Sequence, residues 1–400
     1  RWMRLDSGLP GDNFMRVVRA DPEREGLLYA GSEGGLFVSF DDGDHWQSLK
    51  MNFPTVPITD LRVRQNTLIA ATQGRGFWAL DELTVIRQLN VNLSEKKLHV
   101  FKPKPSSLMR WGGRTAANEG KNPPSGVVFS YFLAEEFEGP LSIDIRDTDG
   151  TVVRTYSSEE RDFDRCVIGN MTPRLAYSMK YPPMKPGLNQ WTWDMRKEGL
   201  TCIDDIRLFA GFSGPTVTPG QYSVSVRIGD HSDSASFALS ADPRVDASPE
   251  DYLFLDAKRS EAATMLNELL EALDNARIAR ARIEALVLDS GNNAALKALS
   301  EEAINKLNTW ENLVTQTGYK TYEDEDSMPP MLDVHIRHVF DVIDRAGAPV
   351  SEGSLQRLSD LREQWLIAKA QLVAITESEL SQINEWAQEN NVLHVAAPID

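Results

Sequence analysis

The sequence has few of the features that mark membrane or nucleic-acid-binding proteins. No apolar run approaches the ~20 residues that cross a bilayer as a helix. Lys and Arg number 42 against 59 Asp and Glu, which gives a formal net charge of -17. Phosphate backbones and anionic membrane surfaces are bound through clustered Lys and Arg, so this balance argues against both. We therefore predict no membrane span and no nucleic-acid partner.

Cysteine is scarce as well, with two in 400 residues. Cys166 and Cys202 either form a disulfide in an oxidising compartment or remain buried thiols, and their spacing does not decide between these alternatives. The first residues, Arg1-Trp2-Met3-Arg4, lack the apolar segment of a signal peptide. The chain begins without Met, as if cut from a longer polypeptide.

Motifs of common enzyme classes are also absent. The sequence contains no Gly-x-Ser-x-Gly elbow, no phosphate loop and no dinucleotide fingerprint. Gly74-Arg75-Gly76 lacks the following helix that a phosphate site requires. We predict no cofactor.

What is present indicates a well-folded soluble protein of two or three domains, because 400 residues with 41% hydrophobic content exceed one ordinary core. Up to about residue 90, short apolar strands alternate with Gly-rich turns. The segment Ser39–Trp46 has the form Ser-x-Asp-x-Gly-x-x-Trp and predicts a β-hairpin. Asp41 hydrogen-bonds following amides, Gly43 accepts positive φ, and Trp46 packs beneath the hairpin. Asp41 is therefore predicted to be structural and not catalytic.

This part of the sequence repeats itself. The strand that begins at Phe14 corresponds to the one at Ile58, and the strand at Leu28 corresponds to the one at Leu68. The offset of about 40 to 44 residues is the length of a four-stranded propeller blade. A ring needs about four to eight blades, so two cannot close one. Most of such a ring is expected upstream of Arg1.

The hairpin motif and the segment Ala71–Asp81 resemble the last blades of bacterial sortilin-like propeller proteins, which carry bacterial neuraminidase repeats (the Asp-box) and are often labelled glycosyl hydrolases. The resemblance covers the whole chain in order. It implies two terminal blades in residues 1–90, an immunoglobulin-like sandwich of the hook-capping type, a helical tail, and a secreted, periplasmic or cell-surface location. Members are usually far longer, with a secretion signal and most of the propeller in front. The residues it assigns are Ser39, Asp41, Gly43 and Trp46 in the Asp-box, and Gly74, Arg75, Gly76 and Trp78 in a blade turn.

Residues 91–126 are predicted to be a connector, because Lys102-Pro103-Lys104-Pro105 is too rich in proline for a regular element. Between residues 127 and 242 strands return. Asp147-Thr148-Asp149-Gly150 joins two alternating strands as a hairpin turn. Pro219–Val224 has the turn-then-strand form of immunoglobulin-like sandwiches, which we predict for this domain.

After residue 242 the apolar period changes from two to 3.6, which predicts helices. Ser248-Pro249-Glu250-Asp251 is a helix start, with a Ser cap, a Pro at the first position and acids in the first turn. Four apolar stripes follow, the last interrupted near Thr376. They predict an antiparallel helical bundle for residues 243–400.

Glycoside hydrolysis requires two carboxylates that face each other across a sugar at ~5 to 9.5 Å. Each acid in the N-terminal part has a simpler role in a turn or at a strand edge, so we predict no complete catalytic pair in this chain. The acids concerned are Asp41, Asp42, Asp44, Asp60 and Asp81.

Metal sites are also not predicted. His335 and His338 with Asp333 are too few ligands for a zinc site, and we favour a structural or surface role. The turn Asp147–Gly150 lacks the later ligands of a calcium loop. The acidic run Glu323–Asp326 is typical of a solvated linker, with weak divalent-ion binding as the alternative.

Aromatic residues offer one more binding hypothesis. Trp111, Trp191 and Trp193 form either a stacking platform for a sugar or peptide, or part of the core. Trp191 and Trp193 are two apart on one predicted strand and share a face, and we favour the core.

These observations favour a non-enzymatic function, a binding or scaffold module for protein or glycan partners that packs on the upstream propeller of the same protein. The alternative is a glycoside hydrolase whose catalytic acids lie upstream. A third hypothesis is subunit packing, in which the bundle uses its remaining apolar face to form a homo-oligomer or to dock on the propeller. An exposed apolar stripe on the helix over 355–372 would favour it.

Overall fold

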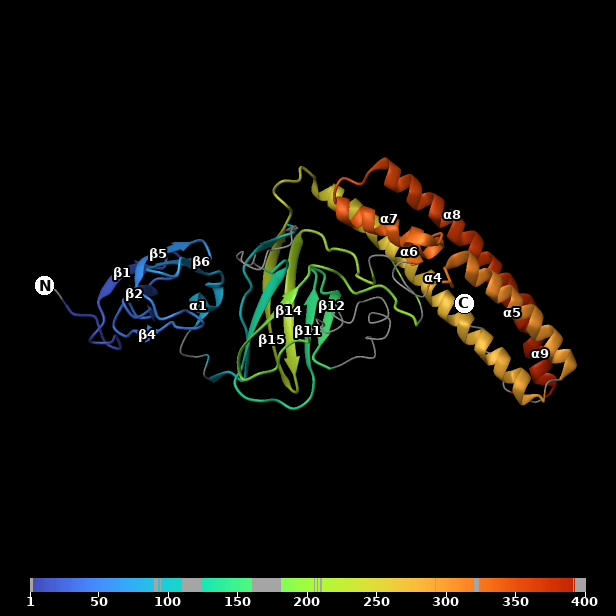
Figure 1. The fold of residues 1–400 in the computed structure, drawn as a ribbon, viewed down its shortest axis with the longest axis horizontal. Coiled ribbons are helices and arrows are strands. Elements are labelled where there is room, and N and C mark those ends of the chain that lie inside the picture. The colour runs from blue at the N-terminus through green and yellow to red at the C-terminus, as the bar shows by residue number, and fades with distance from the viewer. Residues whose placement is uncertain are drawn as a thin grey trace.

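The computed structural model describes residues 3–89, 93, 95–109, 124–159, 181–204, 206, 208, 211–291, 293–319, 324–390 and 392. Strands dominate this part of the chain up to residue 240, and long helices follow from Pro249. Figure 1 shows three bodies along the long axis: two small sheets, a larger pair of sheets, and the helices. The prediction of a mainly β and then α chain is confirmed at this level.

The N-terminal body consists of two antiparallel sheets whose strands follow one another in chain order. Their first strands, β1 and β5, lie beside each other. Leu27, Tyr29, Ile58 and Leu61 are at most 1% exposed and belong to one hydrophobic core that both sheets share. The elements are β1 (Met15–Ala20), β2 (Leu28–Ser32), β3 (Leu36–Ser39) and β4 (Gln47–Ser48) in the first sheet, and β5 (Ile58–Arg64), β6 (Thr67–Thr72) and β7 (Phe77–Leu80) in the second, followed by α1 (Thr84–Gln88).

The middle body contains a three-stranded sheet in the order β13-β10-β8 and a five-stranded sheet in the order β12-β11-β14-β15-β9. All neighbouring strands are antiparallel except β15 and β9, which are parallel. The strands are β8 (Leu98–Val100), β9 (Ser106–Ser107), β10 (Val127–Leu133), β11 (Leu141–Arg146), β12 (Val152–Ser157), β13 (Gly187–Trp193), β14 (Gly220–Ile228) and β15 (His231–Ser240).

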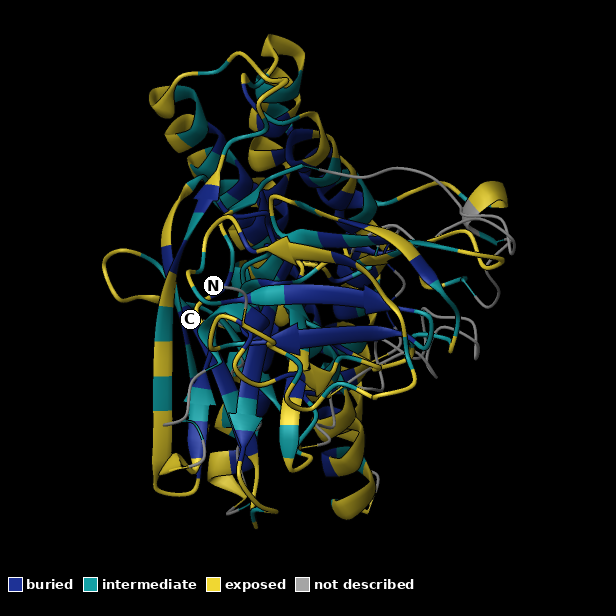
Figure 2. Ribbon diagram, turned by 90° about the vertical axis from the view of Figure 1, so that its left-hand side faces the viewer, coloured by how far each residue is buried: buried dark blue, intermediate teal, exposed yellow. Residues whose placement is uncertain are grey.

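These two sheets pack face to face over one core. Every second residue of β10, from Val127 to Leu133, is fully buried, as the period of a strand with one inward face requires. Phe129 contacts Phe237 of the other sheet, with ring centroids 5.5 Å apart. Figure 2 shows such buried residues in dark blue along the strands and on the inner sides of the helices.

Strands β8 and β9 lie in the segment 91–126, for which the sequence indicated only a connector. Leu98 and Val100 are buried in the core of the middle body. The backbone N–H of Val100 donates to Asp233, 2.9 Å away, and the His99 ring contacts the same carboxylate. A strand of three residues is too short to show a period, so only its partners on β10 and β15 reveal it.

The C-terminal helices share a second large core. Ser248 caps α4 by accepting a hydrogen bond from the backbone N–H of Asp251, as its capping sequence predicts. The expected interruption at Thr376 is a π-helical turn between two α-helices. The elements are α4 (Pro249–Asp289), α5 (Ala294–Val314), α6 (Asp324–Ser327), α7 (Leu332–Ala346), α8 (Glu352–Ile375), η2 (Thr376–Leu380) and α9 (Ser381–Glu389).

The segment between β13 and β14 joins the middle body to the helices. Leu200, Ile203 and Phe212 are buried in the helical core and not between the sheets. Asp344 of α7, 2% exposed at its side chain, forms ion pairs of 3.0 Å with Arg196 and with Arg259 of α4. The backbone N–H and the hydroxyl of Thr216 also donate to Asp344, at 2.9 and 3.0 Å. The sheets and the helices are therefore connected by a buried polar cluster as well as by apolar packing.

Candidate functional site

The hairpin Ser39–Trp46 forms a closed hydrogen-bonded turn between β3 and β4. The buried Ser39 hydroxyl donates to Asp41 Oδ1 at 2.8 Å and accepts from the backbone N–H of Gly43 at 2.9 Å. Gly43 has φ +98°, which suits glycine. The residues of the motif therefore form hydrogen bonds with one another within the turn.

Asp41 is held by the same turn. Its Oδ1 accepts the backbone N–H of His45 at 2.9 Å, and its Oδ2 lies 2.7 Å from the His45 ring nitrogen Nδ1. The hydrogen bond from the His45 backbone, followed by those from the His45 and Ser39 side chains, lowers the pKa of Asp41 to about 2. A carboxylate that remains ionised in this way is a poor proton donor, and its oxygens are engaged by the turn.

Trp46 anchors the hairpin to the start of the described chain. Its ring is 8% exposed and packs with Ala30 and Phe37. The indole N–H donates to the carbonyl of Leu5 at 3.1 Å, and the Trp46 backbone N–H donates to Ser7 at 2.8 Å. The tryptophan thus joins the segment around Leu5 and Ser7 to strands β2 and β3 of the first sheet.

The turn Gly74-Arg75-Gly76 connects β6 to β7 at the surface. Gly74 and Gly76 have φ +99° and +65°. The Trp78 indole donates to the carbonyl of Arg75 at 3.1 Å, and its ring packs edge-on against Phe53 with centroids 5.3 Å apart. This arrangement shapes a turn and presents no anion cradle above a helix.

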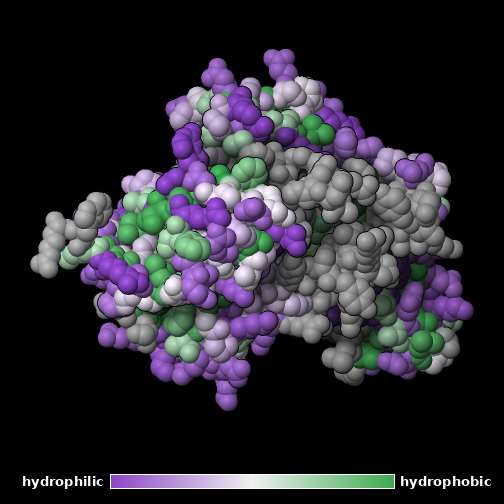
Figure 3. Space-filling model, turned by 60° about the vertical axis from the view of Figure 1, so that its left-hand side comes forward, coloured by the Kyte–Doolittle hydropathy of each residue, from purple (hydrophilic) through white to green (hydrophobic). Residues whose placement is uncertain are grey.

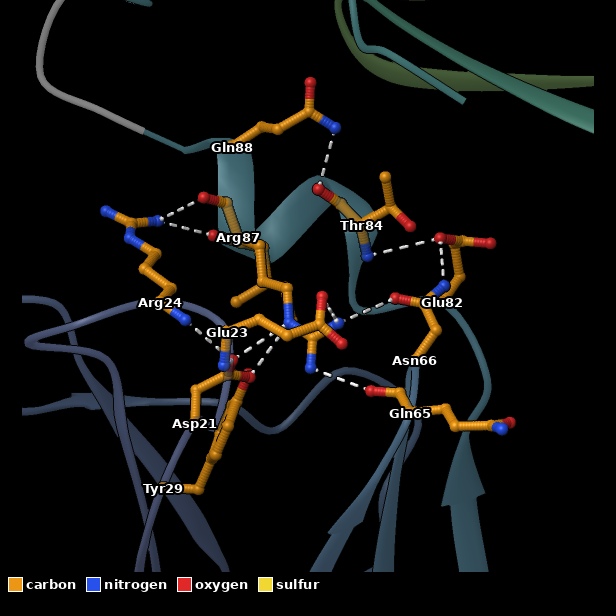
Figure 4. A network of polar contacts seen from close by, with 11 residues as sticks. Asp21, Glu23, Arg24, Tyr29, Gln65, Asn66, Glu82, Thr84, Arg87 and Gln88 are labelled. Atoms are coloured by element: carbon orange, nitrogen blue, oxygen red, sulfur yellow. Dashed lines mark hydrogen bonds and ion pairs between the residues drawn. The ribbon is translucent and has the colours of Figure 1, made fainter. Parts of the chain in front are cut away.

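A buried polar cluster that sequence reasoning missed connects the two N-terminal sheets (Figure 4). Asp21, with no side-chain exposure, accepts two 3.0 Å contacts from Nε of Arg87 on α1. The Tyr29 hydroxyl donates to the same carboxylate at 3.1 Å, and burial followed by the Asp21 charge raises the tyrosine pKa. Arg24 donates to the carbonyls of Ile86 and Arg87, at 2.7 and 3.1 Å.

The cluster continues into the second sheet, where Arg87 donates to the carbonyl of Gln65 at 2.8 Å. Asn66 donates to Glu82 at 2.7 Å, and this carboxylate also accepts the N–H of Thr84 at the start of α1. No local pattern links residues 66 positions apart, which is why the sequence did not indicate the pair of Asp21 and Arg87. The groups that contact this polar cluster belong to the two sheets and to α1, so the cluster holds α1 against both sheets.

The remaining N-terminal acids lie apart in turns and on strands. Asp42 is exposed with φ +61°, and its backbone N–H donates to Gly26. Asp44 and Asp81 are exposed. Asp60 of β5 forms a 2.6 Å ion pair with Arg19 of β1. Their contacts are those of turns and strand edges.

Two further acidic segments of the sequence lie in a hairpin turn and beside a short helix. The carboxylate of Asp147 accepts the backbone N–H groups of Asp149 and Thr151, at 3.1 and 2.9 Å, so it stabilises its own hairpin turn. Of the run Glu323–Asp326, the first residue lies outside the described residues, and the run continues into α6. Among the described residues, no group of three or more His, Cys, Asp or Glu side chains is placed to hold a metal ion.

The side chains of Asp333 and of the two histidines of α7 lie in different surroundings. Asp333 is 1% exposed and accepts a 2.7 Å hydrogen bond from the Thr315 hydroxyl. Burial raises its pKa to about 6. His335 and His338 instead line a cavity beside the first turn of α8, together with Arg357. Burial, and then the charges of Arg357 and His338, lower the pKa of His335.

The aromatic candidates lie mostly in the core. Trp193 is fully buried and stacks near Phe129, with centroids 6.5 Å apart, so the core interpretation is confirmed for it. Trp191 is half-buried against Tyr156, 5.1 Å between centroids. Trp111 lies outside the described residues.

The possible disulfide stays a prediction. Cys166 lies outside the described residues, and Cys202 is partly buried against the helical core.

No protein-family model matches the chain, and no curated protein matches it. None of the helices within the described ranges combines the length and apolar character that a membrane crossing requires.

Proposed function

We propose that this chain is a binding or scaffold module of a secreted or cell-envelope propeller protein, with two blades in residues 1–90, an immunoglobulin-like sandwich and a helical bundle. The observation that carries the proposal is the pair of antiparallel sheets in the N-terminal body. They follow each other in the chain, lie with their first strands side by side, and share one core. Successive blades of a propeller have this relation.

Two details of these sheets support an internal repeat. Strand β1 has a register shift between Met15 and Val17, and strand β5 has one between Ile58 and Asp60. The same irregularity at the start of both first strands fits the repeat of about 40 to 44 residues. The hydrogen-bonded hairpin Ser39–Trp46 fastens only the first sheet.

Exposed apolar residues on the N-terminal body support further blades. Phe14 and Phe77 are 77% and 82% exposed, and Val18 of β1 is 48% exposed. Figure 3, which brings this end of the molecule forward, shows green hydrophobic atoms between purple hydrophilic ones. Neighbouring blades would remove such side chains from water, at a gain of roughly 25 cal/mol per Å².

The scaffold part of the proposal rests on the connection between the middle body and the helices. The buried cluster of Asp344, Arg196 and Arg259 and the packing of Leu200 in the helical core hold the two together. In this proposal, the middle body and the helices form one unit that carries the N-terminal sheets. No catalytic role is proposed for the acids described above, because the carboxylates of Asp41 and Asp60 are engaged in a turn and an ion pair and the other three acids are exposed.

Mass spectrometry of the protein from its natural source tests this proposal. We expect an intact mass well above 44.7 kDa, and peptides that contain further Ser-x-Asp-x-Gly-x-x-Trp segments. A native protein whose peptides contain no other such segment would contradict the blade assignment.

A hydrolysis screen on β-glucans separates the binding function from the glycoside hydrolase alternative. We expect no release of reducing sugar by the full-length protein, while a labelled sample is retained by a glycan or a protein on a printed array. Turnover that survives purification of the full-length protein would replace the binding proposal with an enzymatic one.

A further inference from the structure

An open cavity of about 300 Å³ lies between the middle of α7, from His335 to Val342, and the first turns of α8, and most of its lining residues are solvent-exposed. Cavities of this size are at the lower end of the range that binds small molecules. Val339 and Val342 provide its apolar part. The other lining residues are polar or small: His335, His338, Ser351, Gly353, Ser354 and Arg357.

The lining is basic although the chain as a whole is acidic. None of the eight lining residues is Asp or Glu, in a chain with a formal net charge of -17. Most arginines nearby on the helices have carboxylate partners, as Arg345 does in its 2.8 Å ion pair with Asp341. Arg357 forms no ion pair within the described part of the chain. Its guanidinium is thus available to a ligand.

The hydroxyl groups of the cavity retain hydrogen-bonding capacity. Ser351 and Ser354 hydroxyl oxygens lie 2.9 Å apart, and Ser351 also accepts the backbone N–H of Ser354 at 3.2 Å. One hydroxyl donates to the other, which leaves the second hydrogen for a ligand. The N-terminus of the 24-residue helix α8, which is the positive end of its dipole, also lies at the cavity. Glu352 of the same turn is not part of the lining.

We propose that this cavity binds the phosphate group of a small soluble molecule. A guanidinium, two imidazoles and a hydroxyl offer charge and directed N–H and O–H donors to a tetrahedral oxyanion. The valines would contact the apolar part of the molecule that carries it. This site is independent of the propeller assignment, since all its residues lie on α7, α8 and the residue before α8.

The electrostatics of the histidines agree with an anion. Burial, and then the charges of Arg357 and His338, lower the pKa of His335. No charged residue of α4 or α5 lines the cavity. A bound phosphate would therefore raise the pKa of His335 and favour its protonated form.

Nuclear magnetic resonance of the imidazole groups during a titration with inorganic phosphate tests the proposal on the whole chain. We expect the His335 and His338 signals to shift together and saturate. Arg357→Gln should weaken binding at least about tenfold, because it removes a charge-assisted contact. Arg282→Gln is the matched control, since this exposed arginine of α4 does not line the cavity and should leave binding unchanged.

His338→Gln provides a second variant if Arg357→Gln does not fold, because His338 is exposed; it should also weaken binding. Absence of saturation in the unmodified chain, or equal weakening in Arg282→Gln, would overturn the proposal. Vesicles containing phosphatidic acid distinguish a lipid headgroup from a soluble ligand. No sedimentation with them is expected for so acidic a chain, and sedimentation without a phosphate titration would also overturn it.

Discussion

At the scale of single residues, Ser39 explains why its motif has a fixed spacing. The side chain is fully buried, and its oxygen serves the backbone of Gly43 and the carboxylate of Asp41 at once. A hydroxyl at this position and an acid two residues later are needed for the turn to close. The sequence pattern therefore encodes a local structure, and it carries no reaction chemistry.

Ser39→Ala should destabilise the N-terminal body by about 1–3 kcal/mol, because a buried backbone N–H loses its acceptor. Urea denaturation followed by tryptophan fluorescence measures the change. Ser48→Ala, an exposed serine on β4, is the matched control and should stay within about 0.5 kcal/mol of the unmodified chain. Equal effects of the two substitutions would show that the turn does not depend on this hydroxyl.

Asp333 predicts a dependence of stability on pH. Its pKa in the folded protein is about 6, above its ordinary value of 3.8. Between these two pH values the folded chain retains a proton that the unfolded chain has lost. The contribution of Asp333 to stability therefore falls as the pH rises through this window.

Asp333→Asn removes the cost of ionising this buried group, and we expect it to raise stability at neutral pH by about 1–3 kcal/mol. The gain should shrink as the pH falls toward 4, because the cost of the raised pKa accumulates only as the pH rises through the window between 3.8 and about 6. Unfolding by urea at several pH values measures it. Asp326→Asn, an exposed acid of α6, is the control, and the same pH profile in both variants would contradict this assignment.

At the scale of elements, Asp344 determines how the helices attach to the middle body. Removing it leaves Arg259, 4% exposed, without its ion pair. Asp344→Ala should therefore cost about 3–5 kcal/mol, the usual effect of breaking a buried pair from one side. Arg345→Ala on the same helix removes an arginine whose side chain is 65% exposed, and should cost less than about 1 kcal/mol.

Thermal unfolding of these two variants provides the comparison. Similar melting temperatures for Asp344→Ala and Arg345→Ala would mean that the apolar core alone holds α7 in place.

Several elements of this region can be predicted from the sequence. Ser248 and Pro249 predict the start of α4, and the interruption expected near Thr376 is the π-helical turn Thr376–Leu380.

At the scale of the whole molecule, the chain contains separate hydrophobic cores. The N-terminal core shares no residue with the other two, whereas the segment around Leu200 ties the middle body to the helices. We therefore expect more than one transition in calorimetry. Ser39→Ala should shift one transition, and Asp344→Ala should shift another.

A single cooperative transition that both substitutions lower together would contradict this independence.

The cavity beside α8 also depends on the fold of the whole molecule. His335, His338 and Arg357 come from two helices, and the sequence showed the histidines only as a weak metal candidate. Their common surroundings arise from the packing of α7 against α8.

The sequence by itself determined the features that depend on near neighbours. The turn at Ser39, the alternation that buries Phe129, and the cap at Ser248 need only residues a few positions apart, where propensity and period act. Only the tertiary structure decided the pair of Asp21 and Arg87, the short strand at Leu98, and the place of residues 200–212 among the helices. These contacts join distant positions, and their energy comes from burial that exists only once the chain has folded.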